Sequence, residues 1–252
     1  MTTTKGTMAI DGFVSLLGTS HKSDLSDAYS DEYLTTIMYL TPYITNVDGI
    51  DRNLCPFAAM NLCHGPCLET AGRGIMAPVR IARKARTLLY WRDRTRFMDI
   101  ARSDLRRHRA KAIKNRRTAV ARLNGLSDIA FETTTLMAEF PDIIFYDYTK
   151  SLKRMKRYLA GQFPANYSLT FSRGAGNDDE CAQVLALGGN VAMVWRTFAA
   201  IPIGRTFTVD GVDYPVINGV EHDLRFLDPK GVIVGLKALG KAKQDHSGFV
   251  LD

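Results

Sequence analysis

Runs of apolar residues alternate with polar, helix-forming segments through the second half of the chain. Four of these runs predict strands, at 118–125, 142–150, 167–174 and 190–196. The intervening segments predict helices, at 127–140, 151–162 and 178–189, and the last has acids in its first turn and glycine past its end. Strands of nearly continuous apolar residues between helices indicate a parallel sheet buried on both faces.

The two ends of the chain show other patterns. Near the N-terminus, β-branched and apolar residues bounded by turn formers predict strands at 12–20 and 33–42, and the polar stretch 21–32 between them predicts a loop. Near the C-terminus, 205–223 predicts a hairpin that turns at its Asp-Gly pair, and 231–240 predicts a final strand. Residues 79–115 predict helix, with a break at 92–97 and Asp93 or Thr95 as the second cap.

Composition adds limits to this picture. The chain has 252 residues, of which 46% are hydrophobic and 23% charged, which suits one sizeable core, so we expect a single α/β domain over 1–252. No run approaches about 18 apolar residues, and the N-terminus lacks the apolar stretch of a secretory signal. We therefore expect no membrane association and a cytoplasmic location, where thiols stay reduced.

Polar side chains follow each of the predicted parallel strands. Because the carboxyl ends of parallel strands lie at one edge of a sheet, these side chains predict a ligand site there. The alternative is that polar residues simply mark strand ends. His222 is added from the sequence Glu-His-Asp at 221–223, where Glu221 and Asp223 share one face of a strand and His222 takes the other. The candidate substrate-binding residues are Arg122, Asn124, Asp147, Lys150, Ser172, Arg173, Arg196 and His222.

Three of the four cysteines lie within the glycine- and proline-containing loop 53–74. Cys55, Cys63 and Cys67 are spaced C-x7-C-x3-C. Thiolates are soft ligands that suit zinc or an iron–sulfur cluster. A structural zinc site needs four protein ligands, and here the fourth would be His64 or the distant Cys181. A [4Fe–4S] cluster normally takes four thiolates, although three suffice when another group occupies the fourth iron. The spacing favours the cluster over zinc or no metal.

Positive charge is concentrated in the predicted helical segment 79–117. Between residues 80 and 117, 15 Lys or Arg face three Asp, a balance of +12, although the whole chain carries only +7. Such a block is typical of a phosphate-binding surface, and the aromatic residues around 90–97 could stack on bases. The alternatives are a solvated outer helix or an acidic protein partner. The candidate nucleic-acid-binding residues are Arg92, Arg94, Arg96, Arg106, Arg107 and Arg109.

Several phrases together resemble a family of phage proteins, the gene product eighty-eight family. They are LLGTSHK at 16–22, the cysteine loop, ARLNGLSDI at 121–129, FPDIIFYDYTK at 140–150, YSLTFSR at 167–173 and EHDLRFLDP at 221–229. The resemblance covers about residues 14–250. It implies a phage origin, and hence the host-cell cytoplasm. It also implies an iron–sulfur cluster on a partial (β/α) barrel-like parallel sheet, similar in outline to radical S-adenosylmethionine enzymes.

Two functions remain as hypotheses. The first is an iron–sulfur protein with a [4Fe–4S] cluster on the three loop cysteines and a small-molecule site at the strand ends. Its ligand could be S-adenosylmethionine, although radical enzymes of that class use C-x3-C-x2-C, and its chemistry would be redox or radical in type. The second is a non-catalytic iron–sulfur or zinc module whose basic helices bind DNA, RNA or an acidic protein.

Overall fold

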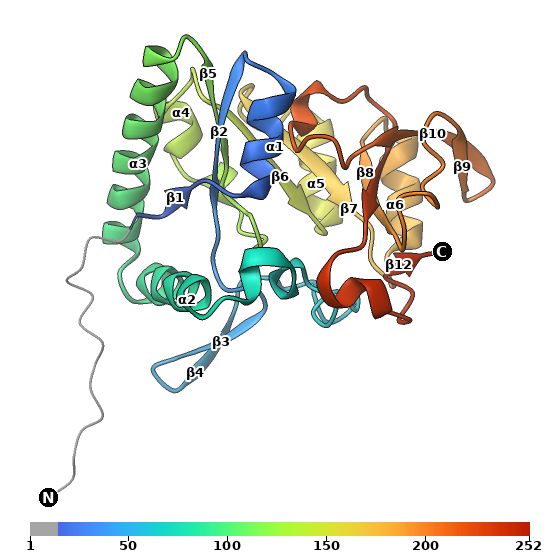
Figure 1. The fold of residues 1–252 in the computed structure, drawn as a ribbon, viewed down its shortest axis with the longest axis horizontal. Coiled ribbons are helices and arrows are strands. Elements are labelled where there is room, and N and C mark those ends of the chain that lie inside the picture. The colour runs from blue at the N-terminus through green and yellow to red at the C-terminus, as the bar shows by residue number, and fades with distance from the viewer. Residues whose placement is uncertain (1–14) are drawn as a thin grey trace, which may run out of the picture.

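A mostly parallel ten-stranded sheet forms the centre of the protein, as the computed structural model of residues 15–252 shows (Figure 1). Neighbouring strands from β2 to β10 run parallel, and β1 and β9 add antiparallel edges. In spatial order the strands are β1 (Leu17–Gly18), β2 (Tyr33–Met38), β5 (Thr118–Arg122), β6 (Ile144–Thr149), β7 (Tyr167–Ser172), β8 (Val191–Trp195), β11 (Ile233–Lys237), β10 (Val212–Asn218) and β9 (Thr206–Val209), with β12 (Val250–Leu251) on β8.

The parallel order confirms the α/β class, but the barrel-like closure is wrong. Strands β1 and β9 lie at opposite ends of the strand order and do not pair, so the sheet is open. Both edge strands pair antiparallel with their neighbours, and neither pairs with the other to close a barrel. The ligand site of an open sheet still lies at the carboxyl ends of its parallel strands.

Helices cover both faces of the sheet. Helices α3 (Arg94–Lys114), α5 (Leu152–Leu159) and α6 (Asp178–Ala186) pack on one face, where their apolar side chains join those of the strands in the main core. Helix α1 (His21–Tyr29) contacts β2 and the segment after β10. A smaller core beneath that segment unites Val120, Tyr146 and Leu224. Strand residues therefore alternate between two buried faces, which explains their continuous apolar character.

The long connection after β2 folds into a cap over the carboxyl ends of the parallel strands. It contains the hairpin β3 (Ile44–Val47) and β4 (Ile50–Asn53), the cysteine loop, short helices η1 (Leu68–Thr70) and η2 (Gly72–Ile75), and helix α2 (Ala77–Arg92). Near the C-terminus, η5 (Gly240–Gln244) packs on η1 and completes the cap. Figure 1 shows these segments gathered below the sheet.

Two predicted features are confirmed in detail, a break between two helices and a hairpin turn. Helices α2 and α3 separate at Asp93, whose carboxylate accepts a hydrogen bond from the Arg96 backbone N–H and so caps α3. Strands β9 and β10 turn at Asp210 and Gly211, both with positive φ, as a two-residue hairpin requires.

Three predicted segments differ from the structure. Residues 21–32 were expected to be a loop, but a capping box between Ser20 and Ser23 starts α1 there. The helix expected over 127–140 is reduced to η3 (Phe131–Thr133) and α4 (Leu136–Glu139), because threonine hydroxyls bond to nearby carbonyls in its middle. The strand expected over 12–20 is only β1, and residues 12–14 lie outside the described residues.

Candidate functional site

A cavity of about 960 Å³ lies between the cap and the carboxyl ends of the parallel strands. Its walls come from the cysteine loop, α2, the ends of β5, β6, β7 and β11, and the segment after β10. Seven Lys or Arg residues and three carboxylates line it, which leaves a formal excess of four positive charges. The volume is at the upper end of the range for small-molecule sites.

Asp223 is the centre of a buried polar network at one wall of the cavity. Its carboxylate accepts hydrogen bonds from Lys22 Nζ at 2.9 Å and from Arg122 Nη1 at 2.8 Å. The hydroxyls of Tyr146 and Tyr148 donate to the same carboxylate at 3.0 and 3.1 Å. Although burial alone would raise the pKa of Asp223, the adjacent cations hold it far below its usual value. The carboxylate is therefore ionised, and its acceptor positions are filled.

Lys150 and Ser172 form a second polar wall, at the ends of β6 and β7. The Lys150 ammonium donates to Ser172 Oγ at 2.9 Å, and to the backbone carbonyls of Ser172 and Arg173 at 3.1 and 2.7 Å. All three of its N–H donors are thereby used. Burial lowers the pKa of Lys150, and the groups that hydrogen-bond to its ammonium are neutral.

Asn124 lines the cavity, and Asp147 supports it from behind. The Asp147 carboxylate accepts from the Asn124 backbone N–H at 2.7 Å and from its Nδ2 at 2.9 Å. Asn124 Oδ1 in turn accepts from Ser127 and from the Ile129 backbone, which fixes the loop after β5. Burial raises the pKa of Asp147 to about 7. Asp147 was predicted to bind substrate, but it is buried and does not line the cavity.

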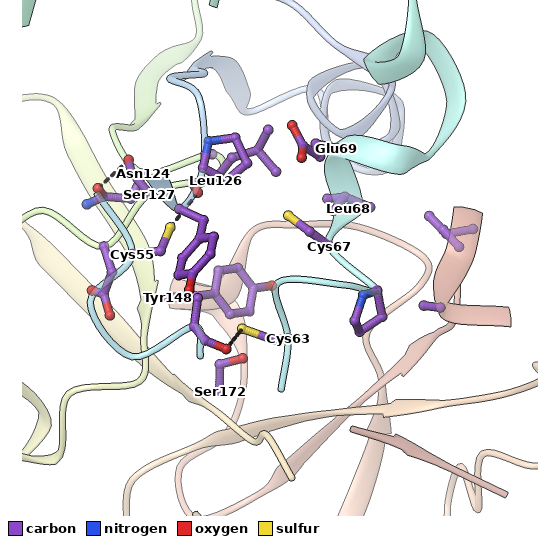
Figure 2. Close-up of a pocket in the computed structure, with 18 of the residues that line it drawn as sticks. Cys55, Cys63, Cys67, Leu68, Glu69, Asn124, Leu126, Ser127, Tyr148 and Ser172 are labelled. Atoms are coloured by element: carbon purple, nitrogen blue, oxygen red, sulfur yellow. Dashed lines mark hydrogen bonds between the residues drawn. The ribbon is translucent and has the colours of Figure 1, made fainter. Parts of the chain in front are cut away.

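The three loop cysteines all line this cavity, and Figure 2 shows their sulfur atoms directed toward the same space. Cys55 Sγ donates to the Leu126 carbonyl at 3.0 Å, and Cys63 Sγ lies 3.7 Å from the Ala58 carbonyl. Burial raises the pKa of Cys55 to about 12 and of Cys67 to about 11, and it also raises that of Cys63. The thiols are therefore protonated at neutral pH and are not preactivated nucleophiles.

These cysteines do not form a compact metal site in the structure. Among residues 15–252, no group of three Cys, His, Asp or Glu side chains is arranged to hold a metal ion. Cys181 is fully buried in α6 and does not line the cavity. His64 lies at the cavity wall, where its ring stacks on Tyr43 at 5.1 Å. Of the two fourth ligands considered for zinc, only His64 is on the cavity side.

The other predicted ligand-binding residues divide between the cavity and the surface. His222 lines the cavity, and its Nδ1 accepts from the Leu224 backbone N–H, so the neutral ring carries its proton on Nε2. Burial and Arg225 lower the pKa of His222 to about 4. Arg173 and Arg196 do not line the cavity, because each forms a surface ion pair, with Asp178 and Asp252.

The six arginines predicted to bind nucleic acid are exposed on α2 and α3, yet most have partners within the protein. Arg92 pairs with Asp48, Arg107 with Asp104 and Arg109 with Asp142, and Arg94 stacks on Tyr90. The pairs with Asp48 and Asp142 offset two of the twelve positive charges, whereas Asp104 is already counted in that balance. The Arg106 side chain has no hydrogen-bond or ion-pair partner within 15–252, as is also true of the side chains of the exposed Lys111 and Lys114.

Sequence reasoning missed several residues of the cavity. Lys22 was missed because it lies in the segment predicted as a loop. Tyr148 was missed because Asp147, its neighbour with the opposite orientation on β6, was chosen instead. Three cations of the cavity wall were not named as site residues. Arg80 and Lys84 were counted only in the basic block 80–117, and Lys237 only in the net charge. Of the residues predicted at the strand ends, Arg122, Asn124, Lys150 and Ser172 line the cavity, and so does His222, which was predicted from the sequence Glu-His-Asp. Binding of a ligand by these residues stays a prediction.

Comparison with known proteins identifies a family but no characterised relative. The family model described as Gene product 88 matches residues 16–252. No curated protein and no solved structure matches the chain. None of the helices described in residues 15–252 is long and apolar enough to cross a membrane. Because the match spans nearly the whole chain, including both the cysteine loop and the strand ends, the protein belongs to the Gene product 88 family of phage proteins.

Proposed function

We propose that the protein binds a small molecule in the strand-end cavity beside a [4Fe–4S] cluster held by Cys55, Cys63 and Cys67. The observation that carries this proposal is that three thiols from one loop line the same cavity as the polar strand ends. Thiolates are the usual ligands of such clusters. Three protein thiolates leave one iron for another group, and the adjacent cavity has room for a small-molecule ligand.

The donor chemistry of the cavity supports this proposal. Three thiolates would bring negative charge into a cavity whose lining carries a formal excess of four positive charges. Because the thiols are protonated without a metal, cluster binding would release protons and would also draw the three sulfur atoms closer together. A bound cluster would supply one-electron chemistry, and S-adenosylmethionine is one candidate for the small molecule. Zinc remains the alternative metal.

Iron, zinc and acid-labile sulfide should be measured on anaerobically purified protein. We expect about four irons and four sulfides per chain. Cys55→Ala, Cys63→Ala and Cys67→Ala should each lose most of the iron. Cys181→Ala is the matched control, because that thiol lies outside the cavity, and it should retain the iron. Zinc without iron in the wild type, or full iron in all three loop variants, would refute the cluster.

The small-molecule part of the proposal has its own measurement. Electron paramagnetic resonance of the reduced protein should change when S-adenosylmethionine is added, if that molecule reaches the open iron. An unchanged spectrum would remove S-adenosylmethionine as the ligand and, with it, the argument for radical chemistry.

A second candidate function is binding of nucleic acid by α3. The observation that favours it is the set of exposed cations Arg106, Lys111 and Lys114 toward the C-terminal end of this helix, whose side chains have no partner among the described residues 15–252. Lys111 and Lys114 are three residues apart and so are neighbours on the helix surface, and Arg106 lies about two turns before Lys114. Clustered cations of this kind attract phosphate without reading sequence. An acidic protein surface would be attracted in the same way.

A further inference from the structure

Three cations at the cavity have side chains without a partner among the residues that the structure describes. Arg80 and Lys84 belong to α2, and Lys237 is the last residue of β11, so they come from segments more than 150 residues apart. All three are exposed and line the cavity. Within residues 15–252, their side chains have no hydrogen-bond or ion-pair partner.

The remaining cations of the cavity are already satisfied. Lys22 and Arg122 share the Asp223 carboxylate, and Lys150 donates to Ser172 Oγ and to the backbone carbonyls of Ser172 and Arg173. Arg83 is buried, donates to the Gly74 carbonyl and lies 3.9 Å from Glu69. Within the described residues, the positive charge without a partner is therefore concentrated on Arg80, Lys84 and Lys237, which are the exposed cations of the cavity lining.

The surface beside these cations is apolar. Ala77, Arg80, Ile81 and Lys84 all line the cavity, at the i, i+3, i+4, i+7 spacing of one helix face. Leu68 and the stacked rings of Tyr43 and His64 line it as well. A molecule bound here would meet positive charge at the mouth and apolar or aromatic walls along the cap.

We propose that Arg80, Lys84 and Lys237 bind the phosphate group of a phosphorylated small molecule whose apolar or aromatic body enters the cavity. A guanidinium and two ammonium groups offer many N–H donors to one dianionic group. Positive charge at the rim of a cavity also raises the local concentration of anions and speeds their entry. This inference rests on the proposed small-molecule site and names a phosphorylated ligand class for it, to which S-adenosylmethionine, having no phosphate, does not belong.

Calorimetric titration of the anaerobically purified protein tests this inference with three probes. They are adenosine 5′-monophosphate, which has a phosphate and a flat body; adenosine, which has the body alone; and inorganic pyrophosphate, which has the charge alone. We expect adenosine 5′-monophosphate to bind most tightly, with an affinity that falls as salt rises. The Arg80→Gln/Lys84→Gln variant should bind it about tenfold more weakly, because two exposed charge contacts with the phosphate are lost.

The control removes the same charge elsewhere. Arg106→Gln/Lys114→Gln takes two exposed cations from α3, away from the cavity lining, and should leave the affinity for adenosine 5′-monophosphate unchanged. Equal binding of adenosine and its monophosphate, no binding of either phosphate probe, or equal losses in the two double variants would overturn the inference. Iron content, measured on the same samples, tests the cluster separately. Failure of the phosphate inference can therefore be distinguished from failure of the cluster proposal.

Discussion

Asp147 illustrates how one buried side chain can organise a site that it does not touch. Its carboxylate accepts two hydrogen bonds from Asn124, and Asn124 in turn bonds to the backbone of the loop 124–129. In that loop, the Leu126 carbonyl accepts a hydrogen bond from the Cys55 thiol. The sequence pointed to Asp147 as a ligand-binding group at a strand end. Side chains alternate along β6, however, and the sequence does not say which face meets the cavity, so Tyr148 takes that position.

Replacing Asp147 by Asn should destabilise the protein and change how its stability depends on pH. An amide opposite the Asn124 donors leaves a buried donor without an acceptor, which costs about 2 kcal/mol. The folded-state pKa of about 7 lies above the ordinary 3.8, so the stability that Asp147 contributes is present below about pH 4 and is lost as pH rises through 7. In urea unfolding between pH 5 and 8, the free energy of unfolding of the wild type should therefore exceed that of Asp147→Asn by less as the pH rises. A constant difference would contradict the raised pKa.

At the scale of elements, local signals identified some segments well and others poorly. The break between α2 and α3 was readable because Asp93 is a strong capping residue, and the β9–β10 turn was readable from its Asp-Gly pair. Helix α1 was missed because its sequence is polar, and two of its serines, Ser23 and Ser26, are buried. Those serines bond to backbone groups, so their burial depends on tertiary contacts that no local pattern reports.

Helix α3 carries the prediction for nucleic acid. If its unpaired cations bind DNA, the affinity should fall steeply with salt, and Arg106→Gln/Lys114→Gln should lower the slope of log affinity against log salt by about 2, one for each lost phosphate contact. Electrophoretic mobility shift or fluorescence anisotropy at several salt concentrations measures this. Arg80→Gln/Lys84→Gln is the control with the same loss of charge. No binding at low salt, or the same slope in both variants, would reject this role for α3.

At the scale of the whole molecule, the strand order was only partly predictable. Apolar runs such as Val191–Trp195 showed that a parallel sheet exists, but they contain no information on whether its edges meet. Closure depends on strands β1 and β9, whose pairing is decided by segments far from the parallel core. The cavity likewise depends on a cap built from residues near 70 and near 240, where the Lys241 backbone N–H donates to Thr70.

Asp223 connects segments of the fold that lie far apart in the sequence. It brings together Lys22 of α1, Arg122 at the end of β5, and Tyr146 and Tyr148 of β6. Removing its charge in Asp223→Asn would leave two cations, the buried Arg122 and the half-buried Lys22, without a counter-ion. Loss of one partner of a buried ion pair costs about 3–5 kcal/mol, so we expect a loss of that size in urea unfolding at pH 7.

The pH dependence of this variant provides the sharper test. The pKa of Asp223 is lowered in the fold, so its contribution to stability is present above the unfolded value near 3.8 and is lost as pH falls toward the folded value. The difference in the free energy of unfolding between wild type and Asp223→Asn should therefore be largest at pH 7 and should decrease below pH 4. Asp179→Asn removes an exposed carboxylate from the first turn of α6 and should lower stability by no more than about 1 kcal/mol, the size of a helix-terminal charge effect. If Asp223→Asn proved as stable as that control, the network would not hold α1 to the sheet, and the cavity wall would have to be supported by packing alone.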